Sequence, residues 1–273
     1  MRPCWLNTKG IGVLKLASWN VNSLKVRLEQ VLAWLDTTQV DILALQETKV
    51  IDALFPAQVF EDSGYHVVFS GQKTYNGVAM ISKYPIESTV TDLPGFDDPQ
   101  RRILATTIQG IRVINLYVPN GAAVGTDKYE YKLRWLVEVS AFIQQQLKEY
   151  PLLAVVGDFN IAPEDRDVHD PIAWKDAVLV SPKEREAFAG LMALGLNDSF
   201  RNFPQAAEAY SWWDYRAAAF RRNRGLRIDH ILLSDALNRH CLESRIDIEP
   251  RRHERPSDHA PVWVTLDDKV CLS

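Results

Sequence analysis

The chain has 273 residues, of which 47% are hydrophobic, so it is long enough to form one large domain around a sizeable core. Its formal net charge is −4, so affinity for a polyanion would have to come from a local basic patch. The three cysteines are odd in number and lack the spacing of metal ligands or of a disulfide framework, which indicates a reducing compartment. No apolar run approaches the roughly 20 residues that span a bilayer, so we expect a soluble cytoplasmic protein without membrane association.

The hydrophobic pattern predicts strands and helices from residue 14 onward. Residues 14–19 alternate like a half-buried strand, and a helix follows in which Leu28, Val31 and Leu35 recur at helical spacing. Ser23 is available as the N-cap of this helix. The further strands are expected, in chain order, at 42–45, 66–70, 77–82, 103–108, 111–118, 152–156, 227–233 and 261–266.

Two more helices are predicted between the later strands. The longer one covers residues 128–148, with Leu136, Val137 and Leu147 on its apolar face, and the shorter one passes through Phe188. Several neighbouring strands are separated only by short, turn-rich loops, which indicates hairpins.

Strands outnumber helices, and the helices are spread singly among them. This pattern favours an α/β sandwich, in which two mixed sheets pack face to face with helices outside, over an all-parallel Rossmann-like sheet. No glycine-rich dinucleotide or phosphate-loop motif argues otherwise. We expect one domain over residues 14–268, with a leader at 1–13 and a tail at 269–273 outside the fold.

The strand at 152–156 runs directly into Gly157, Asp158, Phe159 and Asn160. On an extended chain Asp158 and Asn160 point to the same side, and Gly157 lets the backbone come close to whatever they bind. Taken alone, this junction is more typical of an Asx turn that ends a strand. The other strands weigh against that interpretation, because they also end in polar residues.

Collected, the strand ends supply carboxylates, carboxamides, a tyrosine and a histidine: Asn20, Glu47, Tyr117, Asn120, Asp158, Asn160, Asp229, Asp258 and His259. Without a nearby cysteine, this set suits Mg²⁺, or Mn²⁺ as a substitute, rather than zinc. Because Mg²⁺ takes only one or two carboxylates from a protein, the remaining groups are free to act on a phosphate and a water molecule.

A single histidine is more often a core or surface residue than a catalyst. His259 differs because a strand follows it directly, which places its imidazole at the same edge as the other polar groups. Asp229 on a neighbouring strand could orient it, and such a pair can relay a proton or stabilise a pentacovalent phosphate. We expect no role for the other five histidines.

Residues 210–227 interleave aromatic side chains with arginines. The stretch contains Trp212 and the arginines Arg216, Arg221, Arg222, Arg224 and Arg227. Stacking faces beside positive charge suit a nucleic-acid contact, although a solvated loop with one tryptophan in the core would have the same composition. Lys73 and Arg101 on other loops could extend the same basic rim.

Six motifs in this order resemble the signatures of the exonuclease III family of apurinic/apyrimidinic endonucleases, within the endonuclease/exonuclease/phosphatase superfamily. They are LASWNVNS at 16–23, LQETK at 45–49, YVPNG at 117–121, GDFNIA at 157–162, GLRIDH at 225–230 and PSDHAPV at 256–262. Together they cover nearly the whole chain. The resemblance implies a four-layer α/β sandwich with the active site at one edge and DNA held across it.

The resemblance also implies roles for the site residues. Glu47 would be the principal metal ligand within a metal site that comprises Asn20, Glu47, Asp158, Asn160, Asp258 and His259. Asp158 would align or deprotonate the attacking water, and the other implied catalytic residues are Tyr117, Asn160, Asp229 and His259. Whether Asp158 or His259 is the general base stays open, as does the number of metal ions.

The implied reaction is attack of water on a DNA phosphodiester, which leaves a free 3′-hydroxyl. The implied enzyme is a monomeric, Mg²⁺-dependent DNA repair hydrolase with 3′–5′ exonuclease, 3′-end-processing and abasic-site endonuclease activities. Its substrates would be double-stranded DNA with abasic sites, nicks, or recessed or blocked 3′ ends. The expected DNA contacts are Lys73, Arg101, Asn120, Trp212, Arg216, Arg221, Arg222, Arg224 and Leu226; the resemblance places Trp212 and Leu226 in the pocket for a base-free sugar.

Two departures from the family pattern bear on the substrate. Bulky residues fill 174–180, where many abasic-site endonucleases carry small ones, and Ala123 stands where some relatives have an inserted arginine. These departures weaken the implication of abasic-site incision and leave that of 3′-end processing. The alternatives are a phosphoesterase of the same fold acting on a non-DNA substrate, and a non-catalytic DNA-binding module that kept the scaffold.

Overall fold

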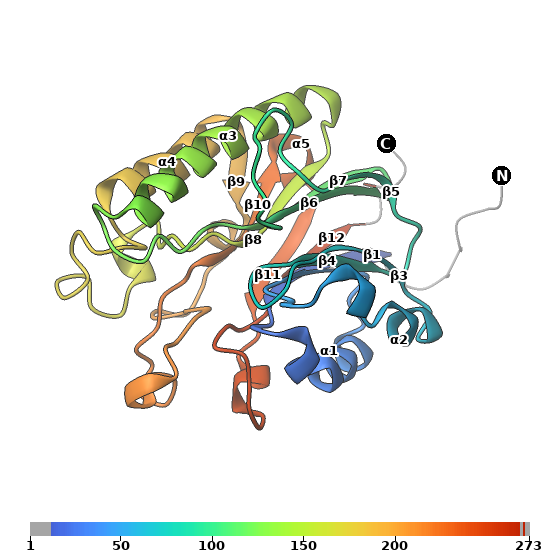
Figure 1. Cartoon of the computed structure of the whole chain (residues 1–273), viewed down its shortest axis with the longest axis horizontal. Helices are drawn as coiled ribbons and strands as arrows, with labels where there is room; N and C mark the ends of the chain where they lie inside the picture. The colour runs from blue at the N-terminus through green and yellow to red at the C-terminus, as the bar shows by residue number, and fades with distance from the viewer. Residues whose placement is uncertain (1–11, 268–269, 271–273) are drawn as a thin grey trace.

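The structure is a computed structural model that describes residues 12–267 and residue 270. Two six-stranded sheets pack face to face, and helices cover their outer faces (Figure 1). The strands of the first sheet, in sheet order, are β11 (Cys241–Ile246), β12 (Val262–Asp267), β1 (Val13–Asn20), β2 (Ile42–Gln46), β4 (Val78–Ser82) and β3 (His66–Ser70). Those of the second sheet are β5 (Glu87–Val90), β6 (Ile103–Ile108), β7 (Ile111–Tyr117), β8 (Leu153–Asp158), β10 (Asp229–Ser234) and β9 (Leu196–Asp198).

Five α-helices and five 3₁₀ turns connect the described strands. The α-helices are α1 (Leu24–Thr38), α2 (Ala57–Asp62), α3 (Asp127–Glu149), α4 (Pro182–Ala193) and α5 (Asp235–Asn238). The 3₁₀ turns are η1 (Asp52–Leu54), η2 (Asp165–Asp167), η3 (Ser199–Asn202), η4 (Arg216–Ala218) and η5 (Glu249–Arg252). Among these helices, none combines the length and the apolar character that a bilayer crossing requires.

Each sheet contains one parallel pair, formed by β1 with β2 and by β7 with β8. Parallel neighbours need a crossover, and α1 and α3 supply it on the outer faces of the two sheets (Figure 1). The other pairs are antiparallel, including the expected hairpins of β3 with β4 and of β6 with β7. Because both strands of a parallel pair end at one edge, the chain segments that follow β1, β2, β7 and β8 can meet there.

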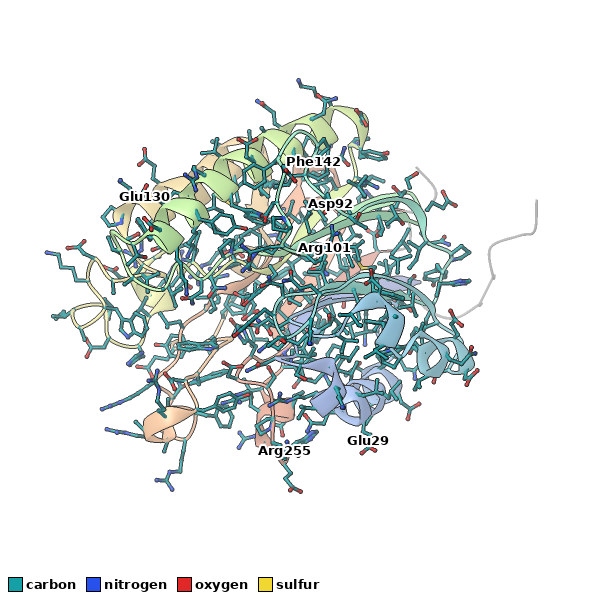
Figure 2. All side chains as sticks on the ribbon, viewed as in Figure 1. Glu29, Asp92, Arg101, Glu130, Phe142 and Arg255 are labelled. Carbon is teal, nitrogen blue, oxygen red and sulfur yellow. The ribbon has the colours of Figure 1, made fainter. Side chains whose placement is uncertain are left out.

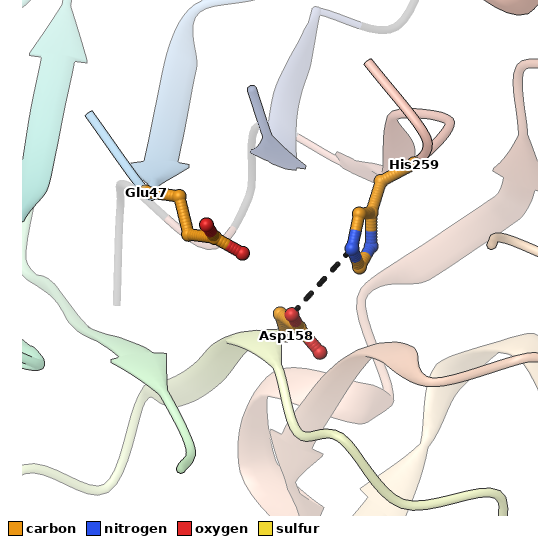
Figure 3. Close-up of side chains that lie close together, drawn as sticks. All are labelled: Glu47, Asp158 and His259. Carbon is orange, nitrogen blue, oxygen red and sulfur yellow. Dashed lines mark ion pairs between the residues drawn. The ribbon is translucent and has the colours of Figure 1, made fainter. Parts of the chain in front are cut away.

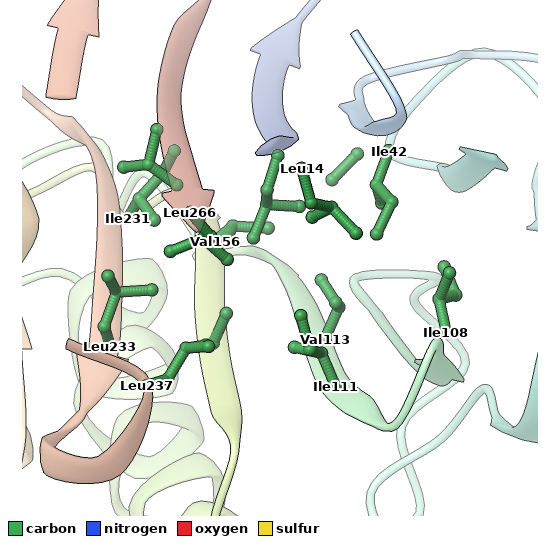
Figure 4. Packing of buried hydrophobic residues seen from close by; sticks show 14 of the residues in the cluster. Leu14, Ile42, Ile108, Ile111, Val113, Val156, Ile231, Leu233, Leu237 and Leu266 are labelled. Carbon is green, nitrogen blue, oxygen red and sulfur yellow. The ribbon is translucent and has the colours of Figure 1, made fainter. Parts of the chain in front are cut away.

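The central core lies between the sheets. Leu14 and Ile42 of the first sheet belong to the same buried cluster as Val113 and Val156 of the second (Figure 4). Two further clusters fill the spaces between each sheet and its helices. On α3, Phe142 faces the covered side and Glu130 is exposed (Figure 2). Apolar residues at strand and helix periodicity thus bury both faces of each sheet, which confirms the predicted α/β sandwich.

One polar bridge crosses the central core. The Gln46 side-chain nitrogen donates to Asn115 Oδ1 at 2.8 Å and to Ser18 Oγ at 2.9 Å. Asn115 in turn donates to the backbone oxygens of Leu45 and Ala79 at 2.9 and 3.0 Å. Buried hydrogen bonds have few alternative partners, so this bridge sets the position of β2 against β7. Gln46 directly precedes Glu47, so the bridge also locates the first predicted site residue.

The boundaries of the fold differ slightly from the prediction. Most of the predicted leader, residues 1–11, lies outside the described residues, but Val13 begins β1. In the predicted tail, 269–273, the structure describes Val270 alone, which is 2% exposed and packs in the central cluster. The fold therefore continues past residue 268.

Two details of the helices also differ. Val137 is 66% exposed, because the buried face of α3 passes through Trp135, Leu136 and Val139 and leaves Val137 about 100° away from Leu136. Ser23 makes no side-chain cap bond. Its backbone nitrogen instead donates to the Glu47 oxygen at 2.7 Å, which ties the start of α1 to the end of β2.

Candidate active site

Strand register brings the polar strand ends together. In the second sheet Tyr117 pairs with Asp158, and Asp158 pairs with Asp229, so the three residues form one row across β7, β8 and β10. In the first sheet Asn20 pairs with Gln46, which places Glu47 at the same edge. His259 lies just before β12.

Glu47, Asp158 and His259 form the centre of the site (Figure 3). One ligand atom from each lies within 4.8 Å of the other two, and His259 Nε2 is 3.7 Å from Asp158 Oδ2. Asp158 and His259 are buried, whereas Glu47 is partly exposed. Two carboxylates that share a partly open site are the oxygen ligands that a small divalent cation takes, so these residues fit such an ion.

Asn20 holds the two carboxylates in place. Its side-chain nitrogen donates to Glu47 Oε1 at 2.8 Å and to Asp158 Oδ2 at 2.9 Å. Its side-chain oxygen accepts from the backbone nitrogen of Asn22 at 3.0 Å. Asn20 therefore presents donors to the cluster, and its oxygen is engaged elsewhere.

Asp258, also predicted near the metal, lies apart from this cluster. Its carboxylate accepts from the Asn22 side chain at 2.9 Å and from Trp212 Nε1 at 3.0 Å. Burial alone would raise the pKa of Asp258, but the charge of His259 and these two hydrogen bonds lower it below its usual value. Asp258 is thus a stable anion that orients Trp212 at the edge of the site.

The imidazole of His259 is held by Asp229. Its Nδ1 lies 2.9 Å from Asp229 Oδ2, and the same oxygen accepts from Ser211 Oγ at 2.6 Å. Since a carboxylate only accepts, Nδ1 carries a proton. Burial alone would lower the pKa of His259, but the charges of Asp229 and Asp158 outweigh it and raise the pKa to about 10. The imidazole is therefore a cation at neutral pH.

Asp158 is poised to exchange a proton near neutral pH. Burial is the main reason that its pKa rises to about 7. The charge of His259 opposes this rise, and that of Asp229 adds to it. A carboxylate with such a pKa can take a proton from water more readily than an ordinary aspartate can.

Two carboxamides lie beside Asp158. Asn160 donates through its side chain to Asp158 Oδ2 at 3.2 Å and to the Val118 oxygen at 3.0 Å. Its side-chain oxygen accepts from the exposed Asn120 at 3.0 Å. Asn160 has a left-handed backbone with φ of 50°, which asparagine tolerates better than most residues.

Tyr117 is the β7 member of the row formed by Tyr117, Asp158 and Asp229, and it pairs with Asp158. Burial, together with the charges of Glu47 and Asp158, raises the pKa of its phenol well above the usual value. The Arg102 guanidinium lies 4.7 Å from the centre of its ring. Tyr117 therefore keeps its proton and can act only as a hydrogen-bond donor or neutral acceptor.

The predicted basic loop is only partly basic on its surface. Arg221, Arg222 and Arg224 are exposed. Arg216 pairs with Asp214 at 2.6 Å. Arg227 is 1% exposed, so its prediction as part of a basic surface is wrong.

The Arg227 side chain points into the interior, where it forms ion pairs with two carboxylates. It pairs with Asp167 and Asp198, both at 2.7 Å. Its Nη1 also donates to His230 Nδ1 at 3.0 Å, and His230 Nε2 donates to the Ile161 oxygen at 2.9 Å. His230 thus has a structural role that the sequence did not indicate.

The other expected DNA contacts differ in their exposure. Lys73 is exposed, and Arg101 pairs with Asp92 at 2.6 Å (Figure 2). Leu226 is fully buried and pairs with Trp212 by backbone hydrogen bonds of 2.9 Å. It packs in a small cluster of loop residues: Ala162, Val168, Leu179, Val180 and Ile228, with Trp174, Ala177, Val178 and Trp212 at its border.

Lys49 beside the centre was not predicted. Its ammonium lies 2.8 Å from Glu47 Oε2 and 2.5 Å from the Asn22 side-chain oxygen. Its place in the LQETK motif, two residues after Glu47, is the signal that could have found it, since both residues have left-handed backbones in the turn that follows β2.

Comparison with known proteins identifies the family to which a chain with this site belongs. Residues 17–259 match the endonuclease/exonuclease/phosphatase family. The chain belongs to this family. A family relative, exodeoxyribonuclease III of Haemophilus influenzae, is 35% identical over 263 residues, which cover 92% of this chain and 98% of that protein.

Solved structures of family members superpose closely. A 3′ phosphatase from Neisseria, NExo, solved with a product DNA hairpin, is 46% identical, with a TM-score of 0.91 and coverage of 93% of this chain and 99% of that one. An AP endonuclease from Archaeoglobus fulgidus is 39% identical, with a TM-score of 0.90 and the same coverage. The predicted family, fold and class, an exodeoxyribonuclease III-like hydrolase of DNA repair, are thereby confirmed.

Proposed function

We propose that this chain is a cytoplasmic, Mg²⁺-dependent phosphoesterase acting on 3′ ends of double-stranded DNA. It hydrolyses 3′-phosphate monoesters, which releases inorganic phosphate, and the terminal phosphodiester, which releases a nucleotide, and both reactions leave a 3′-hydroxyl. The observation that carries the proposal is the cluster of Glu47, Asp158 and His259, with Asp229 behind the imidazole. It unites a cation-binding carboxylate, a carboxylate of raised pKa and a buried imidazolium around one point.

Each group has a distinct task in the proposed reaction. Asp158 accepts a proton from the attacking water. Asn120 donates its second side-chain N–H to a phosphate oxygen, and Asn160, whose own two N–H groups bond to Asp158 and to the Val118 oxygen, holds the Asn120 carboxamide in place. The His259 imidazolium offsets the negative charge that grows on the phosphate, which makes it a charge stabiliser rather than the general base. Glu47, together with Asp158, would hold the divalent cation, which when bound supplies further charge neutralisation.

His259 is the less suitable metal ligand of the three. An imidazole must be neutral to bind a metal ion, whereas Asp229 and Asp158 keep this one protonated at neutral pH. We therefore assign the cation to the carboxylates and the proton to His259.

Preference for 3′ ends over internal abasic sites rests on the loop cluster around Leu226. Leu226 is fully buried and Leu179 is 3% exposed, so a base-free sugar could enter this place only by displacing them. The 3′ end of a strand needs no such pocket, because it reaches the phosphate site from the end of the chain. The Neisseria relative named as a 3′ phosphatase agrees with this choice.

One feature favours DNA over a non-DNA substrate, and another favours an enzyme over a non-catalytic DNA-binding module. Arg221, Arg222 and Arg224 are exposed on a chain of net charge −4, so the positive charge is local and suited to a polyanion. The cluster at Glu47 retains every chemical group that the reaction needs, which argues against a purely non-catalytic module.

The test compares three end-labelled duplexes that carry a 3′-phosphate, a recessed 3′-hydroxyl or an internal tetrahydrofuran abasic analogue, each with Mg²⁺ and with chelator. We expect hydrolysis at both 3′ ends, slower incision of the analogue, and no turnover with chelator. Faster incision of the analogue would reverse the preference. Absence of turnover on all three, with hydrolysis of a lipid or inositol phosphate, would assign the non-DNA alternative.

A further inference from the structure

A buried lysine lies directly behind the two phosphate-site carboxamides. Lys132 points inward from α3 and has no exposed surface. Its ammonium donates to the backbone oxygen of Asn160 at 2.7 Å, to that of Asn120 at 3.2 Å, and to Glu184 Oε1. An ammonium has three donors, so all of them are used.

The counter-charge of this lysine is equally constrained. Glu184 has no exposed surface, and its Oε1 also accepts from the Leu179 backbone nitrogen at 3.1 Å. Its Oε2 accepts from the Ser181 nitrogen at 3.1 Å and from the Ser181 hydroxyl at 2.6 Å, which forms the capping box of α4. Neither charge can move without breaking several other bonds.

The lysine joins two segments that have separate origins in the sheet. Asn120 lies beyond the end of β7 and Asn160 beyond the end of β8, and their carboxamides bond to each other at 3.0 Å. The chain after Asn120 closes over the lysine stem: at Gly121, which has φ of 92°, an added Cβ would lie 3.2 Å from Lys132 Cδ. The ammonium is thus enclosed on the side of both asparagines.

A stabilising role alone explains this arrangement poorly. A buried ion pair contributes little net stability compared with an apolar pair of similar volume, because both charges lose their hydration. An apolar pair could not bind the backbone oxygens of Asn120 and Asn160, whereas the Lys132 ammonium binds both and so fixes the distance between them. The left-handed backbone of Asn160 makes such a constraint important, because its carbonyl has a direction that few residues adopt.

We propose that Lys132 is a positioning residue of the proposed DNA phosphoesterase. Its ammonium binds the backbones of Asn120 and Asn160 together, and so sets the position from which the Asn120 carboxamide, held by that of Asn160, binds phosphate. Glu184 keeps the ammonium in place and links this spacing to the start of α4. The inference rests on the proposed function, since it assumes that the Asn120 carboxamide, held by Asn160, binds phosphate.

The test replaces both charges. Lys132→Met alone would leave Glu184 charged and unpaired in the interior, so the main variant is Lys132→Met/Glu184→Gln, in which glutamine can still complete the capping box. The matched control is Arg112→Met. Arg112 is also buried, at 1% exposure, and donates to a backbone oxygen, that of Ser88, but it lies at the opposite end of β7.

On the 3′-phosphate duplex we expect kcat of the double variant to fall by about 10- to 100-fold, with KM changed by less than about threefold, because misplacement by a fraction of an ångström affects the reacting phosphate more than duplex binding. The control should keep its kcat, although we expect thermal unfolding to show both variants to be less stable than the wild type. Equal kcat in the double variant and the control would overturn the proposal.

A second measurement does not depend on turnover. Inorganic phosphate is titrated into isotope-labelled wild type and double variant, and the side-chain amide signals of Asn120 and Asn160 are followed by NMR. We expect both signals to shift together in the wild type and to respond at least about tenfold more weakly in the variant. Identical responses would overturn the role of Lys132. A wild type that hydrolyses no DNA phosphoester would instead overturn the proposed function, and the NMR comparison would still decide the role of Lys132.

Discussion

Asp229 lies directly opposite Asp158 in the antiparallel pair of β10 and β8, and both carboxylates contact the imidazole of His259. The two acids have different surroundings. Asp229 accepts from Ser211 and from His259 Nδ1, whereas Asp158 lies beside Glu47 and Asn20. Strand register thus gives one acid the task of holding the imidazolium and leaves the other free for water.

The pH profile should report this division. kcat/KM is expected to rise as Asp158 loses its proton, at or below about pH 7 because a divalent cation lowers that pKa further, and to fall as His259 loses its proton near pH 10. Asp229→Asn removes a charge that raises the pKa of His259, so the alkaline limb should move to lower pH. Steady-state rates from pH 5 to 10.5 measure both limbs, and an unmoved alkaline limb would contradict the assignment.

Glu47→Gln should weaken cation binding by about 10- to 100-fold or more, because the amide keeps the shape but loses the charge. Mn²⁺ titration followed by electron paramagnetic resonance measures this affinity directly. Glu29→Gln removes an exposed carboxylate from α1 and is the matched control. If the two variants bind Mn²⁺ equally well, Glu47 is not the principal ligand.

Leu179→Gly should raise abasic-site incision relative to 3′-phosphate removal by about tenfold or more, because it opens the cluster around Leu226. Leu179 has φ of 77°, which glycine adopts without strain, so the variant should fold. Rates on the tetrahydrofuran and 3′-phosphate duplexes give the ratio. Val180→Ala, which enlarges the same cluster without relieving a left-handed backbone, is the control, and an unchanged ratio in Leu179→Gly would mean that this cluster does not select the substrate.

Replacing Arg221, Arg222 and Arg224 with glutamine should weaken duplex binding and lower the salt slope, d log K/d log [salt], by about 2 to 3. The reason is that each exposed guanidinium that contacts a phosphate displaces roughly one counterion. Fluorescence anisotropy at several salt concentrations measures the slope.

The control for this variant removes the same charge at the other edge of the sheets. Lys83, Lys148 and Arg239 lie near the ends of β4, α3 and α5, away from the polar strand ends. Their replacement by glutamine should leave the slope nearly unchanged. Equal slopes for the two triple variants would place the DNA path elsewhere.

His230 should make the fold sensitive to mild acid. Burial and the Arg227 charge lower its pKa from 6.5 to about 4, so the folded form keeps it neutral while the unfolded chain takes up a proton as the pH falls below 6.5. This uptake favours unfolding by about 2 kcal/mol between pH 7 and pH 5. Asp158 and His259 titrate too, so the measurement is a difference of urea-unfolding free energies between the wild type and His230→Asn at both pH values. We expect the unfolding free energy of His230→Asn to fall by about 2 kcal/mol less than that of the wild type between pH 7 and pH 5. An identical pH dependence in the two proteins would contradict this role of His230.

Much of the site could be predicted because each polar residue directly follows an apolar run. Asp158 is the last residue of β8, and Glu47 is the first residue after β2. The direction of a side chain beyond a strand end was harder to predict. Asp258 bonds to Trp212 rather than joining the cluster, and Arg227 turns inward to Asp167, because both depend on partners far away in sequence.

Three of the four outermost described strands were also missed. β5 and β11 are rich in polar residues, and β9 has only three residues, so none of them shows the apolar pattern on which the prediction depends. Such strands are defined by pairing with a neighbour, which local sequence does not encode. Lys132 belongs to the same class: its position on an apolar helix face becomes informative only once β7 and β8 place Asn120 and Asn160 next to it.

The pairing of β12 with β1 has a consequence for biosynthesis. Along the described part of the chain β1 is the first strand of the first sheet and β12 the last, and His259 lies just before β12, with Ala260 and Pro261 between them. A chain still emerging from the ribosome can form β7, β8 and their helix, but it lacks the imidazolium at the site until β12 has docked against β1. The nascent chain should therefore be inactive towards DNA nearby until His259 and β12 have emerged and docked, and its activity should then appear in one step.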